Sequence, residues 1–327
     1  MIAGRAYGLR SHILDNNLKS ALLLAGFPVL LLLVWFAMCL LGAAQSDAAA
    51  TLALGFDYFA ASWPLAILAA GLWFAIAFVA HQAIIDAATG ARRVTRTEEP
   101  ELYNLLENLC ISRGIAMPSL RIMETDALNA YASGLSERTA SIAVTRGLMG
   151  GLDKAELEAV LAHELTHIRN RDVRTMVIAV VFAGIISFVG EMTFRMLSHG
   201  QQPRVSRGRR DGGGGAAAVL LIALAIIAVS YLLAIVIRFL LSRTREYVAD
   251  AGSVELTKNP DAMISALKKV AGRSTMVDAP AEAREMFFDN ETSGFQRLFS
   301  THPAIEDRIK ALIEFAGGVD ADPLPHP

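Results

Sequence analysis

The chain has 327 residues, of which 54% are hydrophobic and 19% are charged, and its formal net charge at pH 7 is -2. Soluble domains average about 25% charged residues, so the composition disfavours a wholly soluble protein. The nearly balanced charge offers no basic surface for nucleic acid, and we expect no nucleic-acid partner.

Three stretches are apolar and long enough to cross the hydrocarbon core of a bilayer, which takes about 20 helical residues. They are 21–44, 58–80 and 216–237, and 176–190 is a shorter candidate. The first stretch is longer than the apolar part of a cleaved signal peptide and a second candidate follows it, so we favour a retained hairpin. The sequence predicts an integral membrane protein with about four transmembrane helices.

The distribution of Lys and Arg predicts the orientation of the first two membrane stretches. Six basic residues flank this pair: Arg5, Arg10, Lys19, Arg92, Arg93 and Arg96. The loop between the stretches, 45–57, has two aspartates and neither Lys nor Arg. Because Lys and Arg favour the cytoplasmic side, we expect the N-terminus and the chain after Arg92 to be cytoplasmic. Cys39 lies in a membrane stretch and Cys110 in a polar one, so we expect no disulfide.

The polar chain after the first hairpin predicts a mixed α+β unit that is mostly helical. Leucines recur on one face of 100–113, which predicts a helix, and 119–123 and 140–145 are typical of short strands. Asp153 followed by Glu156 is a capping-box pattern and predicts the start of another helix.

Two prolines predict helix starts in the last part of the chain, because proline suits the first helical position. Asn259 precedes Pro260, and His302 precedes Pro303. We therefore expect His302 to occupy the N-cap position of the last helix.

The stretch LAHELTHIRNRD, residues 161–172, predicts a metal site on the helix that follows Asp153. His163 and His167 are four residues apart and therefore lie on one helical face, where both imidazoles can bind one ion. Zn²⁺ suits this pair, and Glu164 beside the first histidine has the position of a general base.

The third ligand is predicted in the stretch SRTREYVAD, residues 242–250. Glu246 and Asp250 are again four residues apart on one predicted helical face. Glu246 would complete a site of two histidines and one carboxylate, with a fourth position left for water. Asp250 would accept the second ring N–H of a ligand histidine and hold its orientation.

HELTH, the following NRD and SRTREYVAD resemble the HtpX family of membrane zinc metalloproteases, and the likeness covers nearly the whole chain. The resemblance implies a zincin-type (gluzincin) catalytic domain with one Zn²⁺ per subunit, held by His163, His167 and Glu246, with Glu164 as catalytic residue. It also implies an endopeptidase of the bacterial inner membrane. Such an enzyme acts in the quality control of membrane proteins at the cytoplasmic face, under stress.

Four divisions of the chain follow from this reading. An N-terminal transmembrane hairpin occupies 1–94, and the first catalytic part, with the HExxH helix, occupies 95–175. A second hydrophobic hairpin occupies 176–241, and the second catalytic part, with the third ligand, occupies 242–327. The expected partners are peptide or membrane-protein substrates and the lipid bilayer, and self-association into a homo-oligomer stays open.

Two further stretches resemble features of the family. Residues 129–134 look like the edge strand beside such active sites, so Asn129, Ala130, Tyr131 and Ala132 are candidates for pairing with an extended peptide. The alternative is an ordinary loop. His302 and Arg308 resemble a C-terminal pair, in which His302 donates a hydrogen bond to the oxyanion. The alternative is that His302 only caps its helix.

Three other functions fit the sequence less well. A transporter or channel would need ionisable groups inside its spans, and those here are nearly bare. A membrane-anchored protein that binds zinc without cutting would not need Glu164. A CAAX-type prenyl protease is the nearest alternative, but four membrane segments are few for its usual chamber.

The loop 195–215 makes the topology of the second hairpin testable. It carries several arginines, which oppose a periplasmic position, yet the apolar 216–237 is too long for an ordinary core helix. We expect both segments to span, because the first hairpin sets the orientation. Ser206→Cys, in a background without Cys39 and Cys110, should then react with a membrane-impermeant thiol reagent on intact cells. Labelling only after lysis would place the loop inside.

Overall fold

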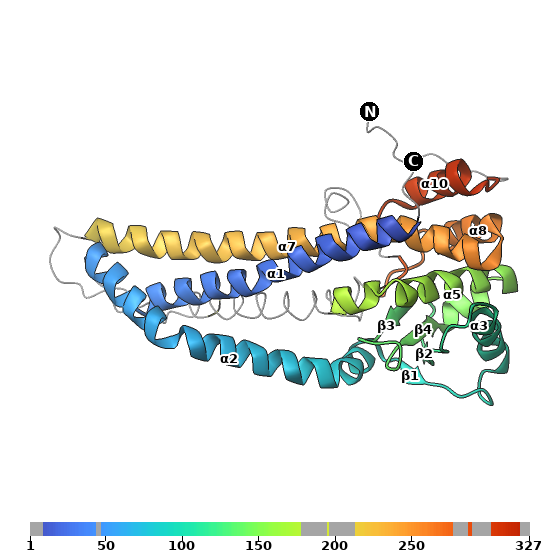
Figure 1. The fold of residues 1–327 in the computed structure, drawn as a ribbon, viewed down its shortest axis with the longest axis horizontal. Helices are drawn as coiled ribbons and strands as arrows, with labels where there is room; N and C mark the ends of the chain where they lie inside the picture. Colours follow the sequence, from blue (N-terminus) through green and yellow to red (C-terminus); the bar gives the residue numbers. More distant parts are fainter. Residues whose placement is uncertain are drawn as a thin grey trace. The chain divides into compact units, whose positions relative to one another are not determined.

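The computed structural model describes residues 9–43, 47–177, 195, 213–276, 287–289 and 302–320. The chain divides into two compact units, and Figure 1 shows the elements that each contains. The first unit comprises 1–17, 79–178 and 239–327, and the second comprises 18–78 and 179–238. The predicted membrane segment 176–190 lies outside the described residues beyond Val177.

In its described residues, the second unit contains the apolar parts of α1 (Leu9–Gly42), α2 (Ala48–Thr89) and α7 (Gly213–Thr257). Small and branched residues form its core: Ala37, Leu40, Ala223 and Ile227. Within the described residues, one helical stretch, Ala48–Ile76, is long and apolar enough to cross a membrane. Pro28–Gly42 and Leu220–Leu233 are shorter apolar stretches, so four transmembrane helices stay a prediction.

The first unit contains a four-stranded sheet in the order β1-β2-β4-β3. Its strands are β1 (Arg92–Arg93), β2 (Ser119–Met123), β3 (Ala130–Ser133) and β4 (Ser141–Thr145). β2 and β4 pair in parallel, and the other two pairs are antiparallel. β3 ends the sheet, and the strand predicted at 140–145 begins one residue later.

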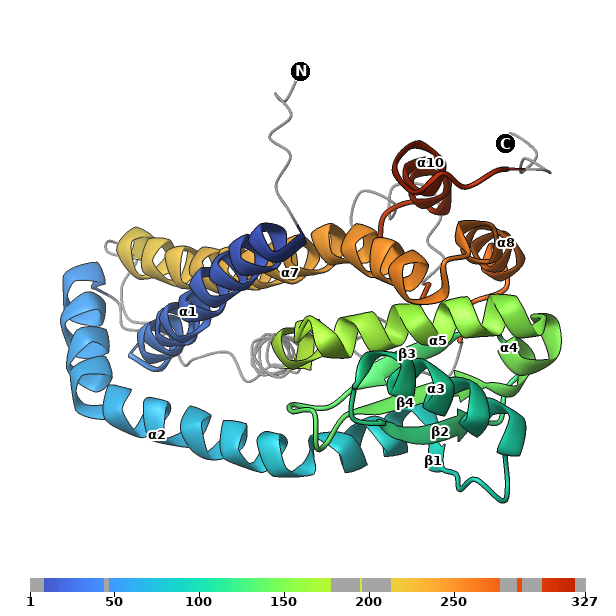
Figure 2. The ribbon, with the colours of Figure 1, turned by 45° about the vertical axis from the view of Figure 1, so that its right-hand side comes forward.

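Helix α5 (Lys154–Arg169) contacts β3 and β4, and α8 (Pro260–Val270) lies beside it (Figures 1 and 2). The predicted capping box is confirmed, since Asp153 and Glu156 each bond the other's backbone N–H. Glu156 also ties α5 to α8, because its carboxylate accepts hydrogen bonds from Ser265 and Lys269, each 2.6 Å long. Asn259 caps α8 as predicted.

The last turns of α7 approach α5 very closely. A Cβ at Gly252 would lie 2.3 Å from Cγ2 of Thr166, so only glycine fits there without a shift. One residue on, Oγ of Ser253 donates to the carbonyl of Ala159 at 2.6 Å. These contacts fix the spacing between two helices that each carry predicted metal ligands.

The first unit also contains α3 (Pro100–Arg113), α4 (Arg146–Gly151) and α10 (Ile305–Ala316). α3 has the predicted bounds, and its leucines are buried. The expectation for α10 is wrong, because its N-cap is Ala304 rather than His302. The backbone is still extended at Ala304, and His302 contacts a buried carboxylate instead. Both cysteines are free, as expected.

The close approach at Gly252 generates a stability prediction. Gly252→Ala should destabilise the protein by about 1–3 kcal/mol, because the buried, branched Thr166 cannot move aside freely. Gly150→Ala is the matched control, since Gly150 lies in α4 with nothing within 4 Å of the added Cβ. The apparent melting temperature of the detergent-solubilised protein should fall only for Gly252→Ala. An equal response of both variants would contradict the tight helix contact.

Candidate metal centre

Three predicted ligands meet at one point between α5 and α7. Nε2 of His163 and Nε2 of His167 are 3.1 Å apart. The carboxylate of Glu246 lies 3.6 Å from the first nitrogen and 3.4 Å from the second. All three side chains are buried, and one ligand atom from each lies within 4.8 Å of the others.

This donor set fits a zinc ion. Tetrahedral geometry with Zn–N distances of about 2.0–2.1 Å places two ligand nitrogens about 3.3 Å apart. The observed 3.1 Å between the histidine nitrogens is close to that value. Two imidazoles and one carboxylate are also a donor set typical of catalytic rather than structural zinc, because they leave one position open.

Asp250 lies where the sequence predicts it, behind the first histidine. Its Oδ1 is 2.9 Å from Nδ1 of His163, so the other ring nitrogen, Nε2, faces Glu246 and His167. Arg308 holds this carboxylate with two hydrogen bonds, from Nε at 2.9 Å and from a terminal nitrogen at 2.6 Å. The result is a chain of contacts from a fully buried arginine to a ligand histidine.

Asp172 does the same for the second histidine, a role not predicted from the sequence. Its Oδ2 is 3.2 Å from Nδ1 of His167, and its Oδ1 is 3.4 Å from Nε of Arg245. α5 ends at Arg169, and the left-handed backbone of Arg171 (φ 61°) turns the chain immediately before Asp172. The NRD that follows HELTH was the available signal, but its role depends on this turn.

Burial and neighbouring charges shift the pKa values of the buried groups in opposite directions. Burial alone would raise the pKa of Glu246, but His302, His163 and His167 together hold it well below its ordinary value. Burial alone would lower the pKa of His167, whereas Asp172 and Glu246 raise it well above its ordinary value. In both groups the contacts with neighbouring side chains outweigh the effect of burial on the pKa.

Glu164 differs from the other carboxylates of the centre. It is 2% exposed, and burial raises the pKa of its carboxyl group. No hydrogen bond or ion pair joins it to another residue in the part of the chain that the structure describes. Among the described residues it is therefore the carboxylate of the centre that has no hydrogen-bond or ion-pair partner.

The predicted C-terminal pair also reaches the centre. Nδ1 of His302 lies 3.0 Å from Oε2 of Glu246, and a terminal nitrogen of Arg308 lies 3.7 Å from the same oxygen. His302 is 4% exposed, so it lies within the site rather than at a helix end. Its predicted hydrogen bond to an oxyanion stays a prediction.

The predicted substrate strand is β3, but part of it is already engaged. The side-chain nitrogen Nδ2 of Asn129 donates hydrogen bonds to the backbone carbonyls of Ser274 and Asp289, each at 2.8 Å. Asn129 therefore connects β3 with two later segments of the chain. The backbone N–H of Phe288 donates to the carbonyl of Ala130 at 2.7 Å.

Phe287 and Phe288 connect this strand edge with the metal ligands. Phe287 forms a β-bridge with Tyr131, so the edge at Ala130 and Tyr131 is not free, contrary to expectation. The ring of Phe288 stands edge-on to that of His163, with centroids 5.0 Å apart. Phe288 thus connects Ala130 with His163, and the part of residues 129–132 in substrate binding stays a prediction.

Comparison with known proteins identifies the family. The sequence profile of Peptidase family M48 matches residues 96–316, a range that contains every residue of the centre. The chain belongs to peptidase family M48. It is 40% identical to the Protease HtpX homolog of Bacteroides fragilis (strain YCH46) over 321 residues, which cover 94% of this chain and 99% of that one.

A second relative supports the same placement. The Protease HtpX homolog of Listeria monocytogenes serotype 4a (strain HCC23) is 37% identical over 257 residues, or 76% of this chain and 84% of that one. The chain is thus an HtpX-like member of family M48, and these similarities support protease activity. Among solved structures, the crystal structure of S. mikatae Ste24p is similar, with a TM-score of 0.49 and 18% identity. The similarity covers 92% of this chain and 66% of that one, slightly under two thirds.

The contact between Asp172 and His167 predicts an effect on metal affinity. Asp172→Asn should weaken Zn²⁺ binding by about 10–100-fold, because the ring of His167 loses the carboxylate that orients it. Competition with a chelator series measures this change. Asp153→Asn is the control, since asparagine caps a helix as well as aspartate and leaves the centre intact. Unchanged Zn²⁺ affinity in Asp172→Asn would contradict the assignment.

Proposed function

We propose that the protein is a membrane-bound zinc metalloendopeptidase with one Zn²⁺ per chain. The observation that carries this proposal is the convergence of His163, His167 and Glu246, with Glu164 beside them and unpaired among the described residues. A binding protein would need the three ligands but would have no use for a buried carboxylate without a structural partner.

Peptide hydrolysis needs a base, an acid and a stabiliser of the oxyanion. When bound, Zn²⁺ supplies a Lewis acid that polarises the scissile carbonyl and lowers the pKa of a water to about 7. Glu164 accepts the proton of the attacking water and passes it to the leaving amine. His302 donates a hydrogen bond to the oxyanion, a role that its position beside Glu246 supports.

The surrounding residues position these groups rather than react. Asp250 and Asp172 each keep one ring nitrogen occupied, so the other nitrogen of each histidine faces the metal position. Arg308 and Arg245 hold the two aspartates in turn.

Substrate access involves the edge of β3. An extended peptide that pairs with this strand gains backbone hydrogen bonds without a sequence preference. Because Phe288 bonds the carbonyl of Ala130, such a peptide must displace the segment 287–289 or pair beyond it, towards Ala132.

The proposed substrates are misfolded or damaged membrane proteins, cleaved at the cytoplasmic face of a bacterial inner membrane as part of a stress response. The apolar stretch Ala48–Ile76 supports an association with the bilayer, and the flanking arginines support a cytoplasmic catalytic unit. About four transmembrane helices and the assignment of 129–132 to substrate binding belong to the same proposal.

Two substitutions separate the base from a ligand. Glu164→Gln should keep Zn²⁺, because the ligands are intact, but lose activity by about 10²–10⁴-fold without its proton acceptor. Glu246→Ala should lose both Zn²⁺ and activity. Zinc content and casein cleavage by the detergent-solubilised protein measure the two effects.

Glu101→Gln is the control for this pair, since it changes an exposed glutamate of the same unit, in α3, that does not belong to the centre. Proteolysis at the wild-type rate in Glu164→Gln would overturn the general-base role. Normal Zn²⁺ content in Glu246→Ala would mean that another residue is the third ligand.

A further inference from the structure

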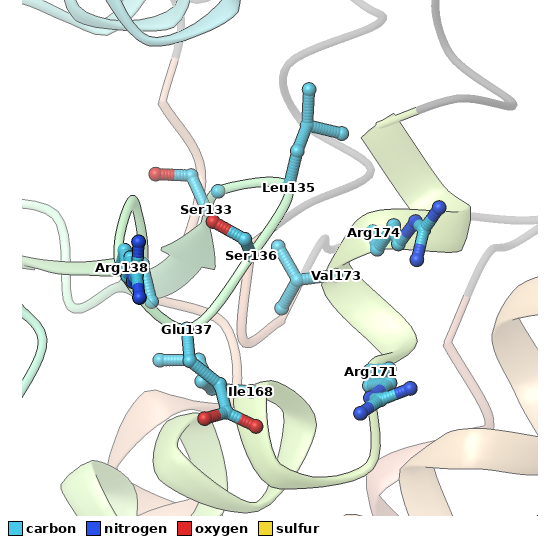
Figure 3. Close-up of a pocket in the computed structure, with 11 residues that line it drawn as sticks. Ser133, Leu135, Ser136, Glu137, Arg138, Ile168, Arg171, Val173 and Arg174 are labelled. Carbon is cyan, nitrogen blue, oxygen red and sulfur yellow. The ribbon is translucent and has the colours of Figure 1, made fainter. Parts of the chain in front are cut away.

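A cavity of about 370 Å³ lies within the first unit. One wall is the loop that follows β3, and the other is the end of α5 with the turn after it (Figure 3). Leu135, Ile168 and Val173 give the cavity an apolar lining.

The position of the cavity continues the proposed substrate path. Ser133, which lines it, is the last residue of β3 and follows Ala132 directly. On the opposite wall, Ile168 follows the ligand His167, and Val173 follows Asp172. A peptide that paired with β3 and continued past Ser133 would run toward this cavity.

The cavity is rich in positive charge. Arg138, Arg171 and Arg174 line it, and all three are exposed. Figure 3 shows Arg171 and Arg174 on the helical wall and Arg138 on the loop opposite. None of the three guanidinium groups has a hydrogen-bond or ion-pair partner among the residues that the structure describes.

Other arginines of this unit behave differently. Arg121, Arg146 and Arg169 each pair with a carboxylate. The cavity holds one acid, Glu137, and no ion pair within the described ranges joins it to the arginines. Three arginines and one glutamate leave a local excess of positive charge that faces the cavity.

We propose that this cavity is a substrate subsite that takes an acidic side chain, Asp or Glu, near the scissile bond. The planar guanidinium group binds a carboxylate through two parallel hydrogen bonds, and the apolar lining accepts the methylene groups of the acid. The subsite rests on the proposed peptidase function and adds a preference that backbone pairing with β3 cannot supply.

The test is a series of peptides in which one Asp is moved through the positions on both sides of the scissile bond. Each peptide has a twin with Asn in place of Asp, which keeps the shape and removes the charge. At the position that reaches the cavity, the Asp peptide should have a kcat/KM about three- to fivefold above that of its twin. Added salt should reduce this preference, because the arginines are exposed.

Substitutions then assign the preference to the cavity. The double variant Arg138→Gln/Arg174→Gln should cleave the Asn peptides normally and lose the preference for Asp. Arg138→Glu/Arg174→Glu should instead favour a peptide with Lys at that position, a reversal that loss of structure cannot produce. Arg93→Gln is the matched control, because it removes an exposed arginine from β1, at the opposite edge of the sheet.

The outcomes separate the subsite from the proposed function. Equal cleavage of Asp and Asn twins at every position would overturn the subsite and leave the peptidase function intact. A preference for Asp that survives both double variants would also overturn it. No cleavage of any peptide by the zinc-loaded wild-type protein would overturn the peptidase function itself.

Discussion

The need to compensate buried charge governs the construction of this protein. Two histidines, three carboxylates and two arginines lie together with 6% exposure or less, and an unpaired charge at such depth would cost several kcal/mol. Two series of side-chain contacts compensate these charges. In each series a buried arginine contacts an aspartate, and that aspartate contacts a histidine. Both series end at Glu246, so the geometry of the centre depends on every member.

The sequence predicted the features that depend only on the local geometry of a helix. The spacing of His163 and His167 places them on one helical face whatever surrounds the helix, and the same holds for Glu246 and Asp250. Asp153 caps α5 through bonds that span three residues. These features need no knowledge of the rest of the fold, which is why residues that the structure brings together could be predicted as a ligand set from the sequence.

Contacts between distant residues could not be predicted in this way. Asn129 is predicted to bind substrate. Its side-chain amide instead donates a hydrogen bond to the carbonyl of Asp289, 160 positions away, and nothing in the strand pattern indicates that partner. His302 precedes a proline and so fitted a helix cap, yet its ring lies beside Glu246, because the tertiary contact outweighs the local preference. Asp172 became recognisable only once the turn at Arg171 was known.

The segment 287–289 links strand and metal centre thermodynamically. Phe288 bonds the edge of β3 through its backbone, packs against His163 through its ring, and accepts a hydrogen bond from Arg308 at its carbonyl. Anything that displaces it from the strand therefore changes the surroundings of a metal ligand. Coupling of this kind is reciprocal, so if a peptide bound along β3 altered metal affinity, metal would alter the affinity of that peptide by the same factor.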